Sequence, residues 1–183
     1  MPRTLRMSSL RLAAAVVAAF ALLRGAAAAP APPPPSRAEL VGLVTRTLKS
    51  WETGDAAAFT SAFTDDAVWA YPGGRIRRGS FADTFNGLCA RKRDIRIYVG
   101  DFIVQGAEFA VQYQFAATDR KTGRRWAVGT GVRGMIRDGR IAVIKEYWDE
   151  HIPVGQAANT LPLDEGEIFP APASVVMTGE RIN

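Results

Sequence analysis

The stretch EYWDEHIP at positions 146–153 gathers several side chains that could do chemistry within eight residues. It contains two carboxylates of interest, Glu146 and Asp149, and the only histidine, His151. It follows a run with Asp-Gly at 138–139, which is typical of a β-hairpin. A carboxylate that a strand carries into an apolar interior loses solvation, so its pKa rises toward neutral pH, as a general base requires. Because successive residues of a strand face opposite sides, either Glu146 or Asp149 is the candidate acid/base.

Other kinds of site find little support in the sequence. One histidine and scattered carboxylates do not make a transition-metal site, so we expect no metal. The stretch GTGVRG (129–134) lies inside a strand-like run rather than before a helix, so it is not a dinucleotide signature, and we expect no cofactor. Cys89 is the only cysteine, which excludes an intramolecular disulfide and indicates an inert, buried thiol.

The first 36 residues differ from the rest of the chain. Residues 1–29 carry four arginines, no acidic residue and a short apolar run followed by small residues, as a secretory signal peptide does; a membrane anchor is the alternative. Removing these four of 23 cations leaves 19 against 18 anions, a net charge of +1, which argues against a nucleic-acid partner. Residues 30–36 read as a proline-rich linker. We therefore expect a secreted or periplasmic protein that does not contact the membrane after cleavage.

The elements that must position the candidate residues are helices first and strands afterwards. Apolar residues at helical spacing predict three helices, and alternating residues joined by short turns predict antiparallel strands. The amphipathic helices must cover one face of the sheet. We predict an α+β fold in which a curved antiparallel sheet forms a cone with three helices on its concave side. The predicted helices lie within 37–54, 56–63 and 80–90, and the predicted strands span 67–71, 94–105, 107–118, 124–137 and 140–150.

Three motifs resemble the nuclear transport factor 2-like superfamily and its SnoaL-like members. They are W-x-x-G-D at 51–55, F-x-D-D-A-V at 63–68 and D-G-R-I at 138–141. The superfamily includes polyketide cyclases, ketosteroid isomerases and limonene epoxide hydrolases, and the resemblance covers roughly 37–153. It implies a cone-shaped domain with an internal pocket, and a homodimer as a common assembly. Residues 154–183 fall outside the resemblance as a proline-rich C-terminal tail.

The resemblance also implies which side chains face the pocket. Glu146 takes the position of an epoxide-hydrolase Asp and is expected to point inward. SnoaL-like cyclases often end this strand in a segment similar to E-x-W-D, which makes Asp149 the alternative acid/base. Tyr71 and Tyr113 are expected to donate hydrogen bonds to a developing oxyanion. The other side chains expected to face inward are Trp69, Phe115, Ala117, Trp126, Val128, Thr130, Ile144 and Trp148.

Departures from the relatives limit the reaction. Epoxide hydrolases carry a water-positioning Arg and a second Asp where this chain has Tyr113 and Phe115. Ketosteroid isomerases carry an Asp base where it has Tyr71, and a helix Tyr where it has Thr47. We therefore expect neither reaction by its usual mechanism.

Together these observations predict an exported small-molecule enzyme that uses acid/base chemistry on a hydrophobic substrate, of isomerase, cyclase or hydrolase type. Trp69, Trp126 and Trp148 are expected to form the pocket walls. The alternative is a non-catalytic module of the same fold, which binds an apolar ligand or dimerises through the outer face of the sheet. A third hypothesis is an accessory structural protein whose aromatic side chains fill the cavity.

Overall fold

The computed structural model describes residues 35–168, which form two helices, a β-hairpin, a third helix, four long strands and a short final helix. The expected signal segment 1–29 and most of the linker lie outside the described residues. The elements are α2 (Arg37–Thr53), α3 (Ala56–Ser61), β1 (Phe63–Tyr71), β2 (Gly74–Arg77), the 3₁₀ turn η1 (Arg78–Ser80), α4 (Phe81–Arg91), β3 (Lys92–Gln105), β4 (Glu108–Asp119), β5 (Arg125–Arg137), β6 (Arg140–Trp148) and α5 (His151–Ala157).

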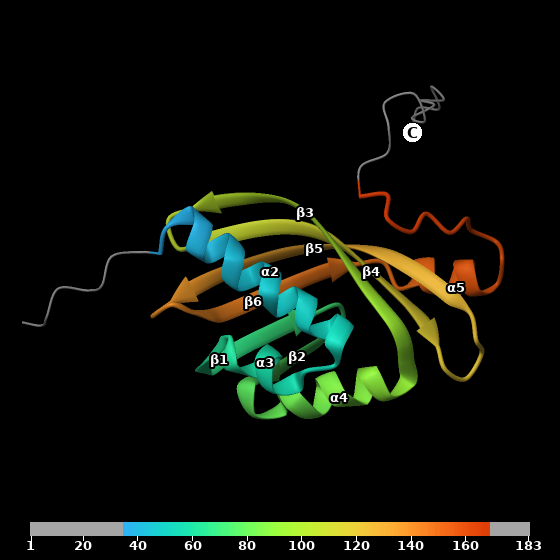
Figure 1. Ribbon diagram of the computed structural model, residues 1–183, viewed down its shortest axis with the longest axis horizontal. Helices are drawn as coiled ribbons and strands as arrows, with labels where there is room; N and C mark the ends of the chain where they lie inside the picture. The colour runs from blue at the N-terminus through green and yellow to red at the C-terminus, as the bar shows by residue number, and fades with distance from the viewer. Residues whose placement is uncertain (1–34, 169–183) are drawn as a thin grey trace, which may run out of the picture. The chain divides into compact units, whose positions relative to one another are not determined.

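The predicted α+β fold is confirmed, and the sheet is curved, open and six-stranded, in the order β2-β1-β6-β5-β4-β3 (Figure 1). Neighbouring strands are antiparallel except β1 and β6, which are parallel, so the sheet is mixed. No hairpin joins β1 to β6, and their relative direction is therefore not restricted by a short connection. The apparent break at Pro72–Gly74 is a tight turn from β1 into β2, in which Gly73 has a φ of +76° that favours glycine.

The three predicted helices are present, and local capping explains where two of them begin. The Ser36 side chain accepts from the Glu39 N–H, and the Glu39 carboxylate accepts from the Ser36 N–H, which starts α2 with a capping box. Gly54 ends α2 in the left-handed conformation, and the Asp55 side chain caps α3. None of the described helices is both long and apolar enough to cross a membrane.

The hydrophobic core lies between the sheet and the layer formed by α2, α3 and α4, which Figure 1 shows on one face of the sheet. Trp51 at the end of α2 stacks on Phe85 of α4 with ring centroids 4.0 Å apart, and it meets Phe59 of α3 at 5.2 Å. Aromatic pairs of this kind add stability beyond the burial of their area. The helices are therefore tied to one another through Trp51 as well as to the sheet.

The chain continues past the last strand into α5, which the sequence pattern did not predict. Pro153 lies in the first turn of α5, where the missing N–H leaves no intrahelical bond unmade. The buried Gln156 side chain accepts from the Ala127 N–H of β5 at 2.8 Å. On β4, the Gln114 side chain donates to the Asp164 carbonyl and accepts from the Gly166 N–H. Part of the segment 158–168 therefore lies on the face of the sheet opposite α2, α3 and α4.

Candidate active site

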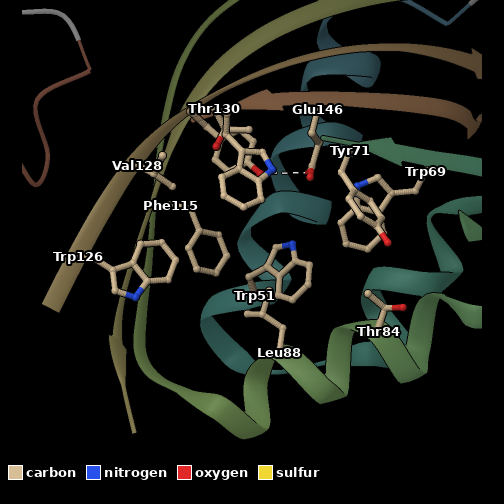
Figure 2. A pocket seen from close by; sticks show the side chains of 12 residues that line it. Trp51, Trp69, Tyr71, Thr84, Leu88, Phe115, Trp126, Val128, Thr130 and Glu146 are labelled. Carbon is tan, nitrogen blue, oxygen red and sulfur yellow. Dashed lines mark hydrogen bonds between the residues drawn. The ribbon is translucent and has the colours of Figure 1, made fainter. Parts of the chain in front are cut away.

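A cavity of about 290 Å³ opens between the sheet and the helices α2 and α4. Its walls are mainly aromatic rings, and Glu146 is its one carboxyl group among the described residues (Figure 2). Mostly apolar concave sites with few polar groups are the usual form of small-molecule sites. The lining residues are Trp51 from α2, Trp69 and Tyr71 from β1, Thr84 and Leu88 from α4, Tyr113 and Phe115 from β4, Trp126, Val128 and Thr130 from β5, and Glu146 and Trp148 from β6.

The structure places most side chains expected to face inward on this cavity. Ala117 and Ile144 were also expected to face the pocket, but they are buried in the hydrophobic core and do not line the cavity. The register pairs Val132 with Glu146 and Thr130 with Trp148. The side chains of Glu146 and Trp148 therefore lie on the same face of β6, as expected from strand alternation. The side chains that are both expected and found in the lining are Trp69, Tyr71, Tyr113, Phe115, Trp126, Val128, Thr130, Glu146 and Trp148.

Glu146 is buried at the inner wall of the cavity with 9% of its surface exposed. Burial disfavours the charged carboxylate and raises its pKa to about 7, opposed by the hydrogen-bonding groups of Trp69 and Tyr113. The Tyr113 hydroxyl donates to Glu146 Oε1 at 3.2 Å. No cationic side chain contributes to this pKa, so the carboxyl is held by uncharged donors alone. A carboxyl that titrates near neutral pH can both accept and return a proton.

The Tyr113 hydroxyl donates its hydrogen bond to the Glu146 carboxyl rather than into the open cavity. It is 4% exposed, and burial raises its pKa well above the usual value, with the Glu146 carboxyl adding to the increase. The phenol therefore stays protonated, and its hydrogen is directed to Glu146. The expected role of Tyr113 as a donor to the substrate competes with this hydrogen bond.

The two cavity-lining residues of β1, Trp69 and Tyr71, direct their polar atoms differently. Trp69 is 6% exposed, and its indole N–H is buried without a hydrogen-bond partner among residues 35–168. Figure 2 shows the Trp69 nitrogen directed toward Glu146, whose pKa it lowers, while the Tyr71 hydroxyl points away from that carboxyl. The Tyr71 ring covers Gly74, where a Cβ would collide with the ring, so glycine is needed for this placement.

Asp149, the alternative acid/base, lies outside the cavity. Its side chain is exposed, and Oδ1 accepts from the His151 N–H at 2.8 Å at the start of α5. His151 is exposed as well. The position of Asp149 one residue beyond the end of β6 explains why strand alternation alone did not settle its direction.

Three lining residues were not assigned to the pocket from the sequence. Trp51, Thr84 and Leu88 lie on α2 and α4 and form the wall opposite the sheet. Trp51 and Leu88 have the helical spacing of core residues, and this spacing does not distinguish packing from pocket lining.

A lysine and aspartate ion pair lies next to Trp126, one of the lining residues of the cavity. The Phe115 and Trp126 rings stack with centroids 5.6 Å apart, and Lys92 Nζ lies 5.2 Å from the centre of the Trp126 ring. Lys92 also pairs with Asp119 at 2.8 Å, and this hydrogen bond holds the pKa of Asp119 well below its usual range. Within residues 35–168 no three His, Cys, Asp or Glu side chains gather as metal ligands.

The comparisons with known proteins agree with this geometry. Residues 44–144 match the model of the SnoaL-like domain, which is more than half of the chain, and the chain therefore belongs to this family. It lies within the nuclear transport factor 2-like superfamily, as the motifs at 51–55, 63–68 and 138–141 indicated. No curated protein sequence matches the chain.

Several solved structures share the fold at low sequence identity. An LEH-like epoxide hydrolase from M. tuberculosis superposes with a TM-score of 0.60 and 20% identity, over 69% of this chain and 94% of that one. A protein with a ketosteroid isomerase-like fold from Catenulispora acidiphila, in complex with trimethylamine, superposes with a TM-score of 0.60 and 14% identity. The match covers 70% of this chain and 97% of that one. IdmH from Streptomyces antibioticus, proposed to be a polyketide cyclase, superposes with a TM-score of 0.58 and 17% identity. The match covers 65% of this chain and 98% of that one. At these identities the likeness establishes the fold and leaves the reaction open.

Proposed function

We propose that this protein is an enzyme that moves protons on a hydrophobic small molecule, with Glu146 as the acid/base. The observation that carries the proposal is a single buried carboxyl with a pKa of about 7 on the wall of an aromatic cavity. Strongly shifted carboxyls in clefts are frequent at catalytic sites. The SnoaL-like family and two of the solved neighbours, the LEH-like epoxide hydrolase and the proposed polyketide cyclase, support this proposal.

The chemistry best suited to one carboxyl is proton transfer at a carbon next to a carbonyl group. Glu146 takes the proton, the C–H electron pair forms a C=C bond, and the carbonyl π pair moves to oxygen. Returning the proton to another carbon isomerises the substrate, and attack of the carbanion on a second carbonyl cyclises it. The water-positioning Arg and Asp of epoxide hydrolases are replaced by Tyr113 and Phe115, which argues against epoxide hydrolysis by the usual mechanism.

The proposal can be tested without knowing the natural substrate. We would incubate the protein with 2-tetralone, a bicyclic ketone with acidic C–H bonds, in D₂O and follow exchange at the carbon by NMR. The wild type is expected to accelerate exchange, and Glu146→Gln is expected to bind the ketone and lose the acceleration. Glu108→Gln, which removes an exposed carboxyl paired with Arg133, is the matched control and should exchange like the wild type. Equal rates for wild type and Glu146→Gln would reject the acid/base role.

A non-catalytic binding module is the second candidate. It is favoured by the lining of the described cavity, in which Glu146 is the one charged residue and no cationic side chain is present to stabilise a developing oxyanion. Binding of 2-tetralone by the wild type without any exchange at carbon would support this candidate.

We also propose that the protein is exported, on the strength of the signal-like composition of residues 1–29. The expected mature N-terminus lies close to Pro30. N-terminal sequencing of protein recovered from the periplasm or medium tests this; an intact Met1 on the mature protein would contradict it.

We propose further that the protein forms a homodimer through the outer face of the sheet. Ile103, Met135, Val143 and Tyr147 are exposed on that face, with Ile103 exposed to 74% and Tyr147 to 53%. Exposed apolar groups on neighbouring strands are typical of contact surfaces. Sedimentation equilibrium should find a dimer that Ile103→Asp dissociates, whereas a monomeric wild type would reject the proposal.

A further inference from the structure

The unpaired N–H of Trp69 is an unusual feature for a buried group. Among residues 35–168, only two buried side-chain polar atoms have no hydrogen-bond partner, Trp69 Nε1 and Arg78 Nε. Arg78 lies in η1 and does not line the cavity, whereas Trp69 does. Buried donors are nearly always paired, because an unpaired one has lost its hydration without a compensating hydrogen bond. The Trp69 N–H nevertheless has no partner at hydrogen-bond geometry within residues 35–168, although it lies near enough to the Glu146 carboxyl to lower its pKa.

The neighbouring groups do not supply the missing acceptor. The Glu146 carboxyl lies on the side toward which the Trp69 nitrogen points, but the two atoms do not meet hydrogen-bond geometry. The Tyr113 hydroxyl donates to Glu146 Oε1 and leaves acceptor sites on the carboxyl group free for a ligand hydroxyl or for a shifted indole. Figure 2 shows the Trp69 nitrogen directed toward Glu146, and both residues line the cavity, so a ligand atom beside that carboxyl would lie close to the indole N–H.

We infer that Trp69 Nε1 donates a hydrogen bond to an oxygen atom of the ligand, which lies beside the Glu146 carboxyl. The ligand class is a neutral, apolar molecule with a carbonyl or hydroxyl oxygen at the end that enters first. This inference rests on the proposed use of the cavity as a substrate site. It also assigns the oxyanion donor to Trp69 rather than to Tyr113, whose hydrogen is directed to Glu146.

An amine cation is the competing ligand class, because aromatic rings and a carboxylate both attract positive charge. The Trp69 N–H argues against it, because the positive end of the indole dipole is directed toward Glu146, the group that would attract the cation. A protonated amine also has no lone pair to accept from this N–H. An oxygen atom satisfies the donor, and a hydroxyl hydrogen can at the same time be donated to Glu146.

The assignment gives Trp69 a defined part in the proposed reaction. As Glu146 removes a proton from the carbon next to the carbonyl, negative charge develops on the carbonyl oxygen. The fixed Trp69 N–H then strengthens its hydrogen bond to that oxygen without reorganisation, which is how preformed donors lower a barrier. Tyr113 is a positioning residue that orients the carboxyl and does not contact the oxygen.

Three ligands with one carbon skeleton test the inference: tetralin without a heteroatom, 2-tetralone with a carbonyl, and 2-aminotetralin as an ammonium cation. Affinities would be measured by calorimetry at about pH 8, where most of the Glu146 carboxyl is ionised. We expect the wild type to bind 2-tetralone about tenfold more tightly than tetralin. Trp69→Phe should remove this preference and leave the affinity for tetralin within about threefold, because the ring is retained.

A matched variant and a spectroscopic measurement separate the donor from general packing. Trp126→Phe also removes an indole from the cavity wall, but it should weaken 2-tetralone and tetralin alike and keep their ratio. In the wild type, the Trp69 indole N–H resonance should move downfield with 2-tetralone and not with tetralin. The Trp69 assignment would come from the resonance that is missing in Trp69→Phe.

The outcomes distinguish this inference from the proposed function. An unchanged 2-tetralone preference in Trp69→Phe would overturn the inference while carbon exchange in the wild type still supported the enzyme. Tighter binding of 2-aminotetralin than of 2-tetralone would overturn the oxygen assignment and favour a cation site. No binding of any of the three ligands would reject both the inference and the use of the cavity as a site.

Discussion

The Tyr113 hydroxyl on β4 donates a hydrogen bond of 3.2 Å to the Glu146 carboxyl on β6, across the intervening strand β5. The two residues are 33 positions apart in the chain, and only the order and register of three strands bring them together. Burial raises the pKa of the carboxyl, and this donor opposes the increase. The result is a group that titrates near pH 7, where proton transfer in both directions is possible.

Tyr113→Phe is expected to raise the pKa of Glu146 above about 7, because the variant keeps the burial and loses a donor to the ionised carboxyl. The ¹³C resonances of labelled glutamate side chains report this pKa directly. The pH profile of carbon exchange with 2-tetralone should move to higher pH in parallel. Thr130→Val, which leaves the direct donors to Glu146 in place, is the control and should shift the pKa less. A pKa that stays at about 7 or falls in Tyr113→Phe would show that the phenol does not stabilise the carboxylate.

Glu146 should make the free energy of unfolding depend on pH between about 4.5 and about 7. Its pKa is 4.5 in the unfolded reference and about 7 in the folded protein, so the folded state binds more protons in this window. Stability is therefore favoured below the unfolded pKa and is lost as the pH rises through the folded pKa, by about 3 kcal/mol at most. Glu146→Gln should remove this decrease.

Urea unfolding at pH values below and above this window measures the effect. The wild type and Glu146→Gln are compared as a difference, so that the contributions of other groups cancel. Glu108→Gln is again the control, because its exposed ion pair contributes little. A decrease with pH that is the same in the wild type and in Glu146→Gln would mean that another group causes it.

Asp149→Ala is expected to reduce stability by about 0.5–1 kcal/mol and to leave carbon exchange unchanged. The Asp149 side chain accepts from the His151 N–H at the beginning of α5 and does not line the cavity. Asp149→Asn keeps an acceptor oxygen and should retain most of the stability. Loss of exchange in Asp149→Asn with normal stability would return the acid/base role to this residue.

Gln156→Ala is expected to destabilise the protein by about 1–3 kcal/mol, because it leaves the buried Ala127 N–H without an acceptor. Gln105→Ala, at an exposed position on β3, is the matched control and should have a small effect. Hydrogen exchange of the Ala127 amide should accelerate in Gln156→Ala alone. If both variants unfold at the same urea concentration, α5 does not stabilise this end of β5.

Much of the cavity was predictable because strand alternation is a local rule. Once Asp138-Gly139 identified the hairpin, the parity of β5 and β6 placed Thr130, Glu146 and Trp148 on one face. The resemblance to SnoaL-like proteins then decided which of the two faces is the inner one. Asp149 remained an alternative because it lies just beyond β6, where alternation no longer applies.

The hairpin partner β2, the parallel pairing of β1 with β6 and the helix α5 were not predicted. Gly73-Gly74 resembles a break as much as a turn, and Pro153 and Gly155 are poor helix residues. Local propensity was overruled in both places by tertiary contacts, in β2 by strand pairing with β1 and in α5 by the Gln156 hydrogen bond to β5.

The sequence by itself determined the class of fold, the order of its main elements and a short set of inward-facing side chains that includes Glu146. Only the tertiary structure decided that Tyr113 donates to Glu146, that Trp51 closes the opposite wall and that the Trp69 N–H has no partner in the described chain. The physical reason is the separation along the chain over which each effect acts. Periodicity reports on residues two to four positions apart, whereas solvation and hydrogen bonding in the cavity depend on side chains from six elements packed together.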